Sequence, residues 1–565
     1  MNNRLLAKSQ LSPSNQLYSA INLGLKSTAW VLVAIIALAP LLGVVIGLWP
    51  AVELDWAAIS RFLGYNGLAY SVASTLLLSL VAPLIALYIA FMVYSRYRFN
   101  RRWQSLEKRL APLLSLPHLA VALGLVYLFS SGGMLWSVLW GFIGQTAPEW
   151  LGLPRKSMLT MILAISIKEV PFFLLIFSAI GRQLAIKQWL LQGRALGYSE
   201  NASWWLIVFP VVLKQSRLAV LAAMAYTLSV LDISLLIGPN IPELYAVVLY
   251  NWQTGFTPDE QTFAFLGNLL LIAMLGVLIA CIYIHERLVT KQLANHAVMA
   301  NPLNITRLSG VFTAWLGFFS LLTLAILATF LLWSLGWNTH STFNTANWSI
   351  SLWQDEWFFM QGPLLNSLHI AFFSSLLGVG VTLLALELQR HNKRYFPDYL
   401  WLLAILLPQL SMVYGWQIVH TSSNASYHSS WIILSHVPFT FAYSYLVLRG
   451  PFQSLNRHYE LVAASFGYSP WQRWWKVRFM LLRPALLSAI AIAFSVSIAQ
   501  YIPTLMIGAG RVATITTEAV AIASGNEQSI TAVYILVQAA LPFIAFLVAS
   551  ILAQRTRGSV DAEHQ

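Results

Sequence analysis

Long apolar runs separated by shorter polar segments dominate this sequence. A run of about 20 apolar residues is long enough for a helix to cross the hydrocarbon core of a bilayer. We predict twelve such helices, at residues 28–49, 69–94, 111–131, 159–180, 216–238, 262–285, 312–336, 365–388, 399–420, 430–448, 485–508 and 531–554. The pattern therefore predicts an all-α polytopic membrane protein with six helices in each half.

The predicted helices divide the chain into two membrane domains with short polar ends. We expect a cytoplasmic leader at residues 1–27, a first domain at 28–300, a second at 301–555 and a cytoplasmic tail at 556–565. Both halves contain six helices and begin on the same side of the membrane. The two domains are therefore predicted to be parallel copies rather than inverted ones.

The composition agrees with a lipid-facing exterior. Of the 565 residues, 58% are hydrophobic and 9% are charged, whereas about 25% of the residues of an ordinary soluble domain are charged. The single cysteine, Cys281, excludes a disulfide framework and a cysteine-based metal site. The net charge of +13 suggests nucleic acid at first sight, but the positions of the basic residues argue against that reading.

Most of the 33 lysines and arginines fall in every second segment between the predicted helices. Cytoplasmic segments of membrane proteins retain positive charge, so we place these segments and both termini in the cytoplasm. The exceptions are Lys168, within a predicted helix, and the external Arg61, Arg155, Lys156 and Arg511. The first apolar run exceeds the length of a signal peptide and is predicted to be retained. The expected location is the bacterial cytoplasmic (inner) membrane.

One polar, glycine-containing stretch occurs twice. It runs from residue 183 to 238 and again from 453 to 508. Eight residues recur 270 positions later, namely Gly197, Tyr198, Ser199, Trp204, Trp205, Phe209, Ile237 and Gly238. A fixed offset indicates two copies of one structural unit. The basic residues of this stretch either fix the topology and contact anionic lipid headgroups or pair with an acidic partner surface, and the duplication of the whole stretch favours docking of a partner.

The repeated stretch resembles the EAA loop of ABC-importer permeases, in which Glu-Ala-Ala, three residues, Gly, nine residues and Ile-x-Leu-Pro follow one another. The residues carried over to the first copy are Arg194, Ala195, Gly197, Ile207 and Pro210, and those in the second are Glu460, Ala463, Ala464, Gly467 and Val477. The first copy lacks the glutamate, and the second has it one place early and lacks the proline. The two-half plan looks most similar to the ferric-iron and thiamine importers.

The resemblance implies a transport subunit that works with partners. The sequence contains no G-x-x-x-x-G-K-[ST] phosphate-binding loop and no cluster of catalytic residues. A separate ABC ATPase, expected in two copies, would bind ATP and dock on the loops, and this chain would bind no cofactor itself. An external solute-binding protein would deliver a small solute such as iron or thiamine. No nucleic-acid partner is expected.

Polar residues within the predicted helices are candidates for the substrate path. Ionisable groups inside a membrane are costly and are often functional. Lys168, Glu169 and Asp232 lie in the first half, and Gln500 and Tyr501 lie beside the position that corresponds to Asp232. Asp232 either contacts a passing cation or pairs with Lys168 to hold the bundle together. No metal site is expected.

The alternative from another class is a twelve-helix proton-coupled secondary transporter. Such proteins commonly carry a G-x-x-x-D-R-x-G-R-R-like turn between helices 2 and 3. Here the turn at residues 95–102 contains neither aspartate nor glycine, and the segment between the halves is not unusually long. A third hypothesis, a membrane-embedded enzyme, has no support, because the sequence shows no cluster of acid, base or nucleophile.

Overall fold

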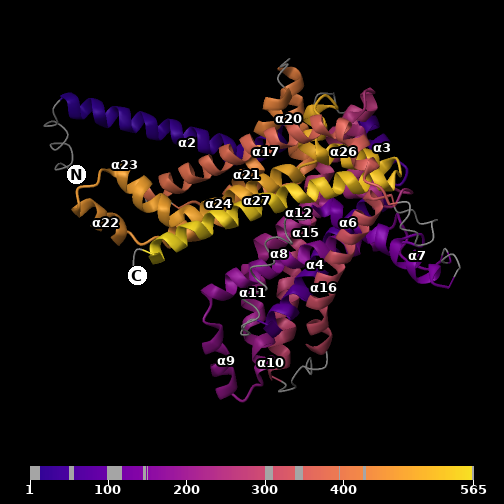
Figure 1. Ribbon diagram of the computed structural model, residues 1–565, viewed down its shortest axis with the longest axis horizontal. Coiled ribbons are helices and arrows are strands. Elements are labelled where there is room, and N and C mark those ends of the chain that lie inside the picture. The colour runs from indigo at the N-terminus through magenta and orange to yellow at the C-terminus, as the bar shows by residue number, and fades with distance from the viewer. Residues whose placement is uncertain are drawn as a thin grey trace.

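The computed structural model describes residues 13–49, 56–97, 117–143, 148, 150–298, 309–336, 348–392, 395–423 and 428–562. These residues form helices joined by short connections and contain no β-strand, only isolated bridges such as Ser130 with Leu153. The molecule consists of two helical arms that diverge from a common region (Figure 1). The all-α prediction is confirmed.

The first half contains α2 (Pro13–Gly47), α3 (Trp56–Leu63), α4 (Leu68–Tyr97), α6 (His118–Phe129), α7 (Met134–Gly141), α8 (Met158–Gln183), α9 (Ile186–Ala195), α10 (Glu200–Ser203), η1 (Trp204–Val208), α11 (Phe209–Gln215), α12 (Arg217–Leu228), α13 (Asp232–Ile237), α14 (Tyr245–Thr254) and α15 (Pro258–Val298).

The second half contains α16 (Ser309–Ser334), α17 (Ser351–Asn392), α18 (Asp398–Trp401), α19 (Leu403–Leu406), α20 (Gln409–Ser422), α21 (His428–Gln453), α22 (His458–Ser465), α23 (Pro470–Arg473), η4 (Trp474–Arg478), α24 (Phe479–Ala499), α25 (Ile502–Gly508), α26 (Ile515–Ser524) and α27 (Gln528–Ala562).

The predicted repeat appears in the helix boundaries. Helices α8, α10, η1, α13 and α14 of the first half begin 270 residues before α21, α23, η4, α25 and α26. The sixth helices α15 and α27 keep the same offset at their first residues. The repeat therefore extends beyond the matching letters of the sequence, into segments where few residues are identical.

Eight helices of the described residues are long and apolar enough to cross a membrane, or nine if the pair Trp204–Gln215 and Arg217–Leu228, bent by 57°, is one span. Each of the twelve predicted runs overlaps a helix, but the 12-residue α6 and the 14-residue α20 are shorter than the runs that predict them. The run 216–238 is divided between α12 and α13. The chain is a polytopic helical membrane protein.

Some helix boundaries differ from the prediction. Helix α2 begins at Pro13 and therefore extends well into the predicted leader. Helices α14 and α26 were not predicted, because runs of 10 residues are too short to be read as membrane spans. The predicted run 111–131 begins partly outside the described residues.

The first helix of each half packs on the other half. Helix α2 contacts α17, α20 and α21, whereas α16 contacts α4 and α6. The contact between α2 and α20 is close because both helices carry glycine: a Cβ added at Gly43 would lie 2.4 Å from the carbonyl oxygen of Met412. The indole of Trp416 also donates a 2.9 Å hydrogen bond to the carbonyl of Ala39. The domain boundaries along the chain stay a prediction, but the helices of the two halves are interlocked in space.

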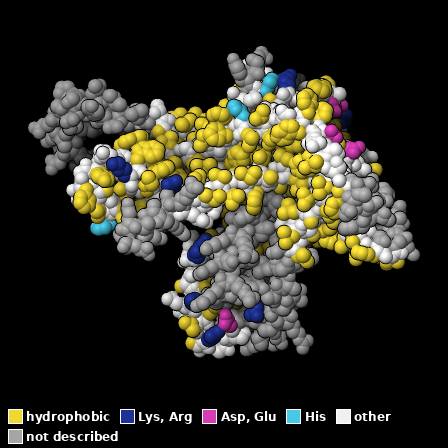
Figure 2. Space-filling view, in the orientation of Figure 1, with side chains coloured by type: hydrophobic (Ala, Val, Ile, Leu, Met, Phe, Trp, Pro, Cys, Tyr) yellow, Lys and Arg dark blue, Asp and Glu magenta, His cyan; other side chains and the backbone are white. Residues whose placement is uncertain are grey.

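Side-chain types follow the arms. Figure 2 shows hydrophobic side chains along the flank of the arm that contains α17, α21, α24 and α27, with lysine and arginine at its far end near α22 and α23. The end of the other arm, near α9 and α10, also carries basic side chains. An apolar flank with basic ends is the surface expected of a membrane-embedded helix bundle.

Candidate functional site

The candidate site has two parts: the repeated loops and a polar cluster between the halves. We call residues 183–210 loop 1 and residues 453–480 loop 2. Loop 1 lies at the end of one arm and loop 2 at the end of the other (Figure 1). In each loop a helix, α9 or α22, is followed by a turn and a short second helix.

The turn of each loop depends on a glycine. Gly197 has φ +86° and Gly467 has φ +81°, and no atom lies within 4 Å of a Cβ added at either position. Left-handed backbone is readily adopted by glycine and is costly for other residues. The glycine was identified from its spacing in the sequence, and its conformation supplies the physical reason for it.

Each loop joins its transmembrane helix through one π-helical turn. These turns are η1 in loop 1 and η4 in loop 2, each of five residues beginning with the Trp-Trp pair. Single π-helical turns within α-helices often mark functional positions. The same irregularity in both copies indicates that the joint between loop and membrane helix is a shared part of the repeat unit.

Loop 1 is anchored by apolar packing. Leu190 on α9 exposes 5% of its surface, Val208 on η1 exposes none, and both belong to the same buried hydrophobic core. Trp204 is also buried and stacks on Phe91 of α4, with ring centroids 5.3 Å apart. We call the part of each loop that lies next to the membrane helices its root. The root of loop 1 is therefore continuous with the core of its arm.

Loop 2 is anchored by charges at the corresponding positions. Glu460 stands where loop 1 has Leu190, and Arg478 stands where it has Val208. Arg478 Nη1 donates a 2.9 Å hydrogen bond to Glu387 Oε1 of α17, and its Nε lies 3.1 Å from Glu460 Oε1. Arg390 Nη2 donates to the same glutamate oxygen at 2.7 Å. We call Glu387, Arg390, Glu460 and Arg478 the charged joint.

The outer face of loop 2 is strongly apolar. Phe466 is 78% exposed and Trp471 is 71% exposed. The other large hydrophobic side chains exposed on α22 and the following turn are Tyr459, Leu461, Val462 and Tyr468. Loop 1 exposes fewer such side chains, chiefly Leu191 and Leu196. An exposed apolar patch of this kind is typical of a surface that binds another protein.

The structure separates the predicted residues of loop 1 into a tip and a root. Arg194, Ala195 and Gly197 are exposed at the tip, where Arg194 forms an ion pair with Glu200. Ile207 and Pro210 are partly buried at the root.

The predicted residues of loop 2 divide in the same way. Ala464 and Gly467 are exposed at the tip, and Val477 is partly buried on η4. Ala463 is buried, and the Glu460 side chain, 18% exposed, is held in ion pairs. The sequence did not indicate that Arg478 would pair with Glu460 and Glu387, because these contacts join distant segments.

The second part of the site lies at matching breaks in the fifth helix of each half. Helix α12 ends at Leu228 and α13 begins at Asp232, whereas α24 ends at Ala499 and α25 begins at Ile502. A break within a membrane helix leaves backbone groups that need partners, and such breaks form binding sites in many transporters. Here the backbone N–H of Gln409, from the second half, donates a 3.0 Å hydrogen bond to the Ser229 hydroxyl of the first.

Polar side chains of both halves gather near these breaks. The His118 ring lies 4.5 Å from that of Tyr226, and His118 Nε2 is 3.1 Å from Glu169 Oε1. From the other half, the amide of Gln409 donates a hydrogen bond to Gln500. His118 and Gln409 each follow a proline at the start of a helix, α6 and α20. The two residues are therefore counterparts in the repeat.

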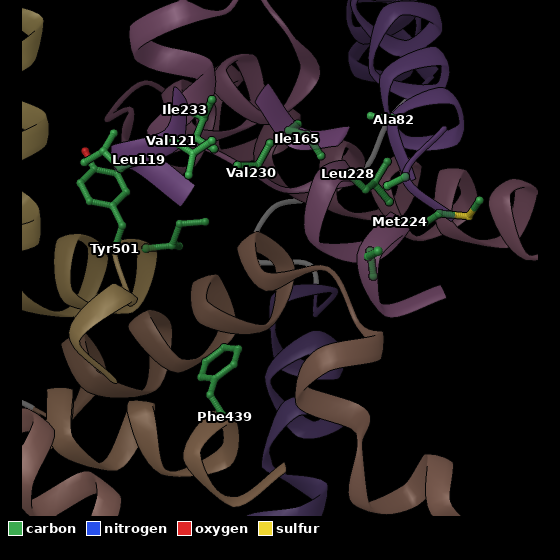
Figure 3. Close-up of a cluster of buried hydrophobic side chains, with 14 of the residues drawn as sticks. Ala82, Leu119, Val121, Ile165, Met224, Leu228, Val230, Ile233, Phe439 and Tyr501 are labelled. Atoms are coloured by element: carbon green, nitrogen blue, oxygen red, sulfur yellow. The ribbon is translucent and has the colours of Figure 1, made fainter. Parts of the chain in front are cut away.

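Asp232 and Tyr501 complete this group. Asp232 is the first residue of α13, is partly buried and lies within electrostatic range of His118 and Tyr501. Figure 3 shows Tyr501 reaching from the second half toward Leu119 in the buried cluster between the halves. We call His118, Glu169, Tyr226, Asp232, Gln409, Gln500 and Tyr501 the central polar cluster.

The cluster contains four of the five residues predicted for the substrate path. Lys168 is the exception, because it lines a cavity of about 20 Å³ between α6, α8, α16 and α27 whose lining contains no member of the cluster. His118, Tyr226 and Gln409 were not predicted as site residues. The signal for His118 and Gln409 was the repeated proline before each of them.

The fold and these sites define a helical membrane protein built from two repeated units, with no β-strand among the described residues. Residues 394–558 match the family model described as the binding-protein-dependent transport system inner membrane component. This match covers most of the second half, including loop 2.

Two relatives extend the comparison. The chain is 29% identical over 531 residues to the inner membrane ABC transporter permease protein YnjC of Escherichia coli, which covers 93% of this chain and 96% of that protein. It is also 29% identical over 163 residues to the spermidine/putrescine transport system permease protein PotC homolog of Mycoplasma pneumoniae, covering 28% of this chain and 57% of that protein. No solved structure matches significantly. The similarities support a multi-pass inner-membrane permease of the ABC-transporter type and do not favour a proton-coupled transporter.

Proposed function

We propose that this chain is the permease of an ATP-driven importer, in which loops 1 and 2 dock a separate ABC ATPase and an external binding protein delivers the solute. The observation that carries this proposal is the pair of loops at the ends of the two arms, each with a left-handed glycine and a π-helical joint at the same offset. Both termini and both loops would face the cytoplasm.

The contact between loop 2 and the ATPase would be mainly apolar. Its exposed face offers Phe466 and Trp471, and aromatic side chains often dominate the energy of protein interfaces. Loop 1 would make a more polar contact through Arg194 and its neighbours. The two ATPase copies that we expect would therefore meet different surfaces.

Copurification tests this docking. The chain is expressed in membranes with the ATPase, and the ATPase retained on the purified chain is measured. We expect Trp471→Ser to reduce the retained ATPase by about tenfold. Trp56→Ser is a matched control, because Trp56 is 78% exposed but lies on α3, away from loop 2 (Figure 1). Equal retention by both variants would contradict the proposed docking face.

The substrate path would pass through the central polar cluster. The cluster holds two acidic residues, Glu169 and Asp232, and Lys168 beside Glu169 offsets one of them, so the remaining negative charge favours a small cation or a solute with a cationic group. Ferric iron, thiamine and polyamines belong to this class. Uptake of radiolabelled candidates should fall in Asp232→Asn, whereas Asp259→Asn, at an exposed position near the start of α15, should retain it. Unchanged uptake in Asp232→Asn would remove Asp232 from the path.

A further inference from the structure

The charged joint of loop 2 connects the loop to the membrane helices around it. Arg478 lies on η4, Glu460 on α22, and Glu387 and Arg390 on α17. The Arg478 guanidinium carbon also lies 5.1 Å from the ring centroid of Phe452, near the end of α21. One side chain thus contacts three separate helices beyond its own.

Arg478 and Glu460, at the centre of the joint, are largely shielded from water. The side chain of Arg478 exposes 7% of its surface and that of Glu460 exposes 18%, whereas those of Arg390 and Glu387 expose 24% and 39%. Two positive and two negative groups balance one another, and a buried charge that loses its partner is strongly destabilising. The contacts therefore depend on geometry. If α22 moves, either Arg478 moves together with Glu460, or the positive charge of Arg478 loses part of its compensation.

The position of Glu460 also determines what it can contact. It is the acidic residue of the repeated motif, and the sequence alone assigns it to the surface that meets the ATPase. In the structure its carboxylate points to Arg390 and Arg478, whereas its neighbours Tyr459 and Leu461 are more than half exposed. The acidic group therefore faces the membrane helices and the apolar groups face outward.

We propose that the charged joint transmits movement of loop 2 to α17 and α24, with Arg478 as the positioning residue, and that the apolar pair of Leu190 and Val208 has this role in loop 1. The inference rests on the proposed function, because the movement would come from a docked ATPase. It assigns Glu460 to transmission within the chain rather than to contact with the partner.

The test replaces the charged pair by the apolar pair of loop 1. Variants Arg478→Val, Glu460→Leu and the double variant are assembled with the ATPase and the binding protein in vesicles. For each we measure the retained ATPase, the stimulation of ATP hydrolysis by the binding protein, and solute uptake. Membrane yield and gel filtration establish that each variant is folded, and Arg478→Lys tests how far a conservative change preserves function.

We expect Arg478→Val to lose about tenfold in uptake and in stimulated hydrolysis while retaining the ATPase. The double variant should recover most of this loss, because it installs the apolar pair of loop 1 and leaves Glu387 and Arg390, which both lie on α17, to balance each other. Uptake that falls only in proportion to the retained ATPase would overturn the inference, as would normal uptake in Arg478→Val or a double variant no better than the single one. If the unmodified chain retained no ATPase, the proposed function itself would fail.

Discussion

Loop 1 and loop 2 have the same backbone plan but are held in place by different chemistry. Their short second helices, π-helical turns and left-handed glycines correspond at one offset. Their roots differ, since Leu190 and Val208 are buried in an apolar core whereas Glu460 and Arg478 form ion pairs. Backbone geometry is therefore the shared requirement of this unit, and more than one kind of side-chain contact satisfies it.

The exposed faces of the two loops show the reverse difference, because the loop with the charged root has the more apolar exposed face. Loop 2, with the charged root, exposes a large apolar face. Loop 1, with the apolar root, exposes the polar tip that contains Arg194 and Glu200. A partner present in two identical copies would therefore meet an unequal pair of surfaces.

The largest expected effect comes from placing the charge of loop 2 in loop 1. Val208→Arg would bury an unpaired guanidinium at a position with no exposed surface and should cost about 5 kcal/mol in the free energy of unfolding. Thermal unfolding in detergent measures the change. Adding Leu190→Glu should recover part of the loss, and no recovery would show that the two roots are not interchangeable.

The tryptophans at the roots give the next largest contrast. Trp204 exposes 2% of its surface, whereas its counterpart Trp474 is only partly buried. We expect Trp204→Ala to lower the free energy of unfolding by about 4 kcal/mol and Trp474→Ala by about half as much. Equal losses in the same unfolding measurement would contradict the difference in burial.

The turns should behave alike. Both Gly197 and Gly467 have positive φ, and a Cβ at either position meets no other atom within 4 Å. Each alanine variant should therefore lose about 1.5 kcal/mol from backbone strain alone. Gly380→Ala is the control, because Gly380 lies inside α17 with open space around it and alanine should stabilise that helix slightly. A clear difference between the two turns would mean that the loops are strained unequally.

The smallest effect on stability is expected at the outer face of loop 2. Trp471→Ser should change the free energy of unfolding by less than about 0.5 kcal/mol, because the side chain is 71% exposed. Measured beside retention of the ATPase, this variant separates binding from stability. A large loss of stability would indicate that Trp471 supports the fold rather than a partner.

The repeat, the helical fold and the polar candidates near the breaks were accessible from the sequence. The offset of the repeated residues located both loops, and the apolar runs located the main helices. The break in the second half leaves a signal of its own, because Gln500 and Tyr501 interrupt the apolar pattern and Pro503 follows them. The break before Asp232 has a weaker signal, since most of the residues around it are apolar.

Contacts between distant segments could not be predicted in this way. Glu387 and Arg478 lie 91 residues apart, and nothing in either local pattern indicates that they meet. For the same reason the sequence did not indicate that Glu460 pairs with Arg390, or that Lys168 lines a cavity between α6, α8, α16 and α27. Side-chain direction depends on how whole helices pack, which periodicity within one helix does not specify.

The exchange of α2 and α16 between the halves has a consequence for biosynthesis. Membrane helices enter the bilayer in the order of their synthesis, and N-terminal segments generally fold first. Helix α2 packs against α17, α20 and α21, so it is synthesised well before the helices that it contacts. Because both halves belong to one polypeptide, α2 stays covalently linked to α17, α20 and α21 until they are inserted and can pack against it.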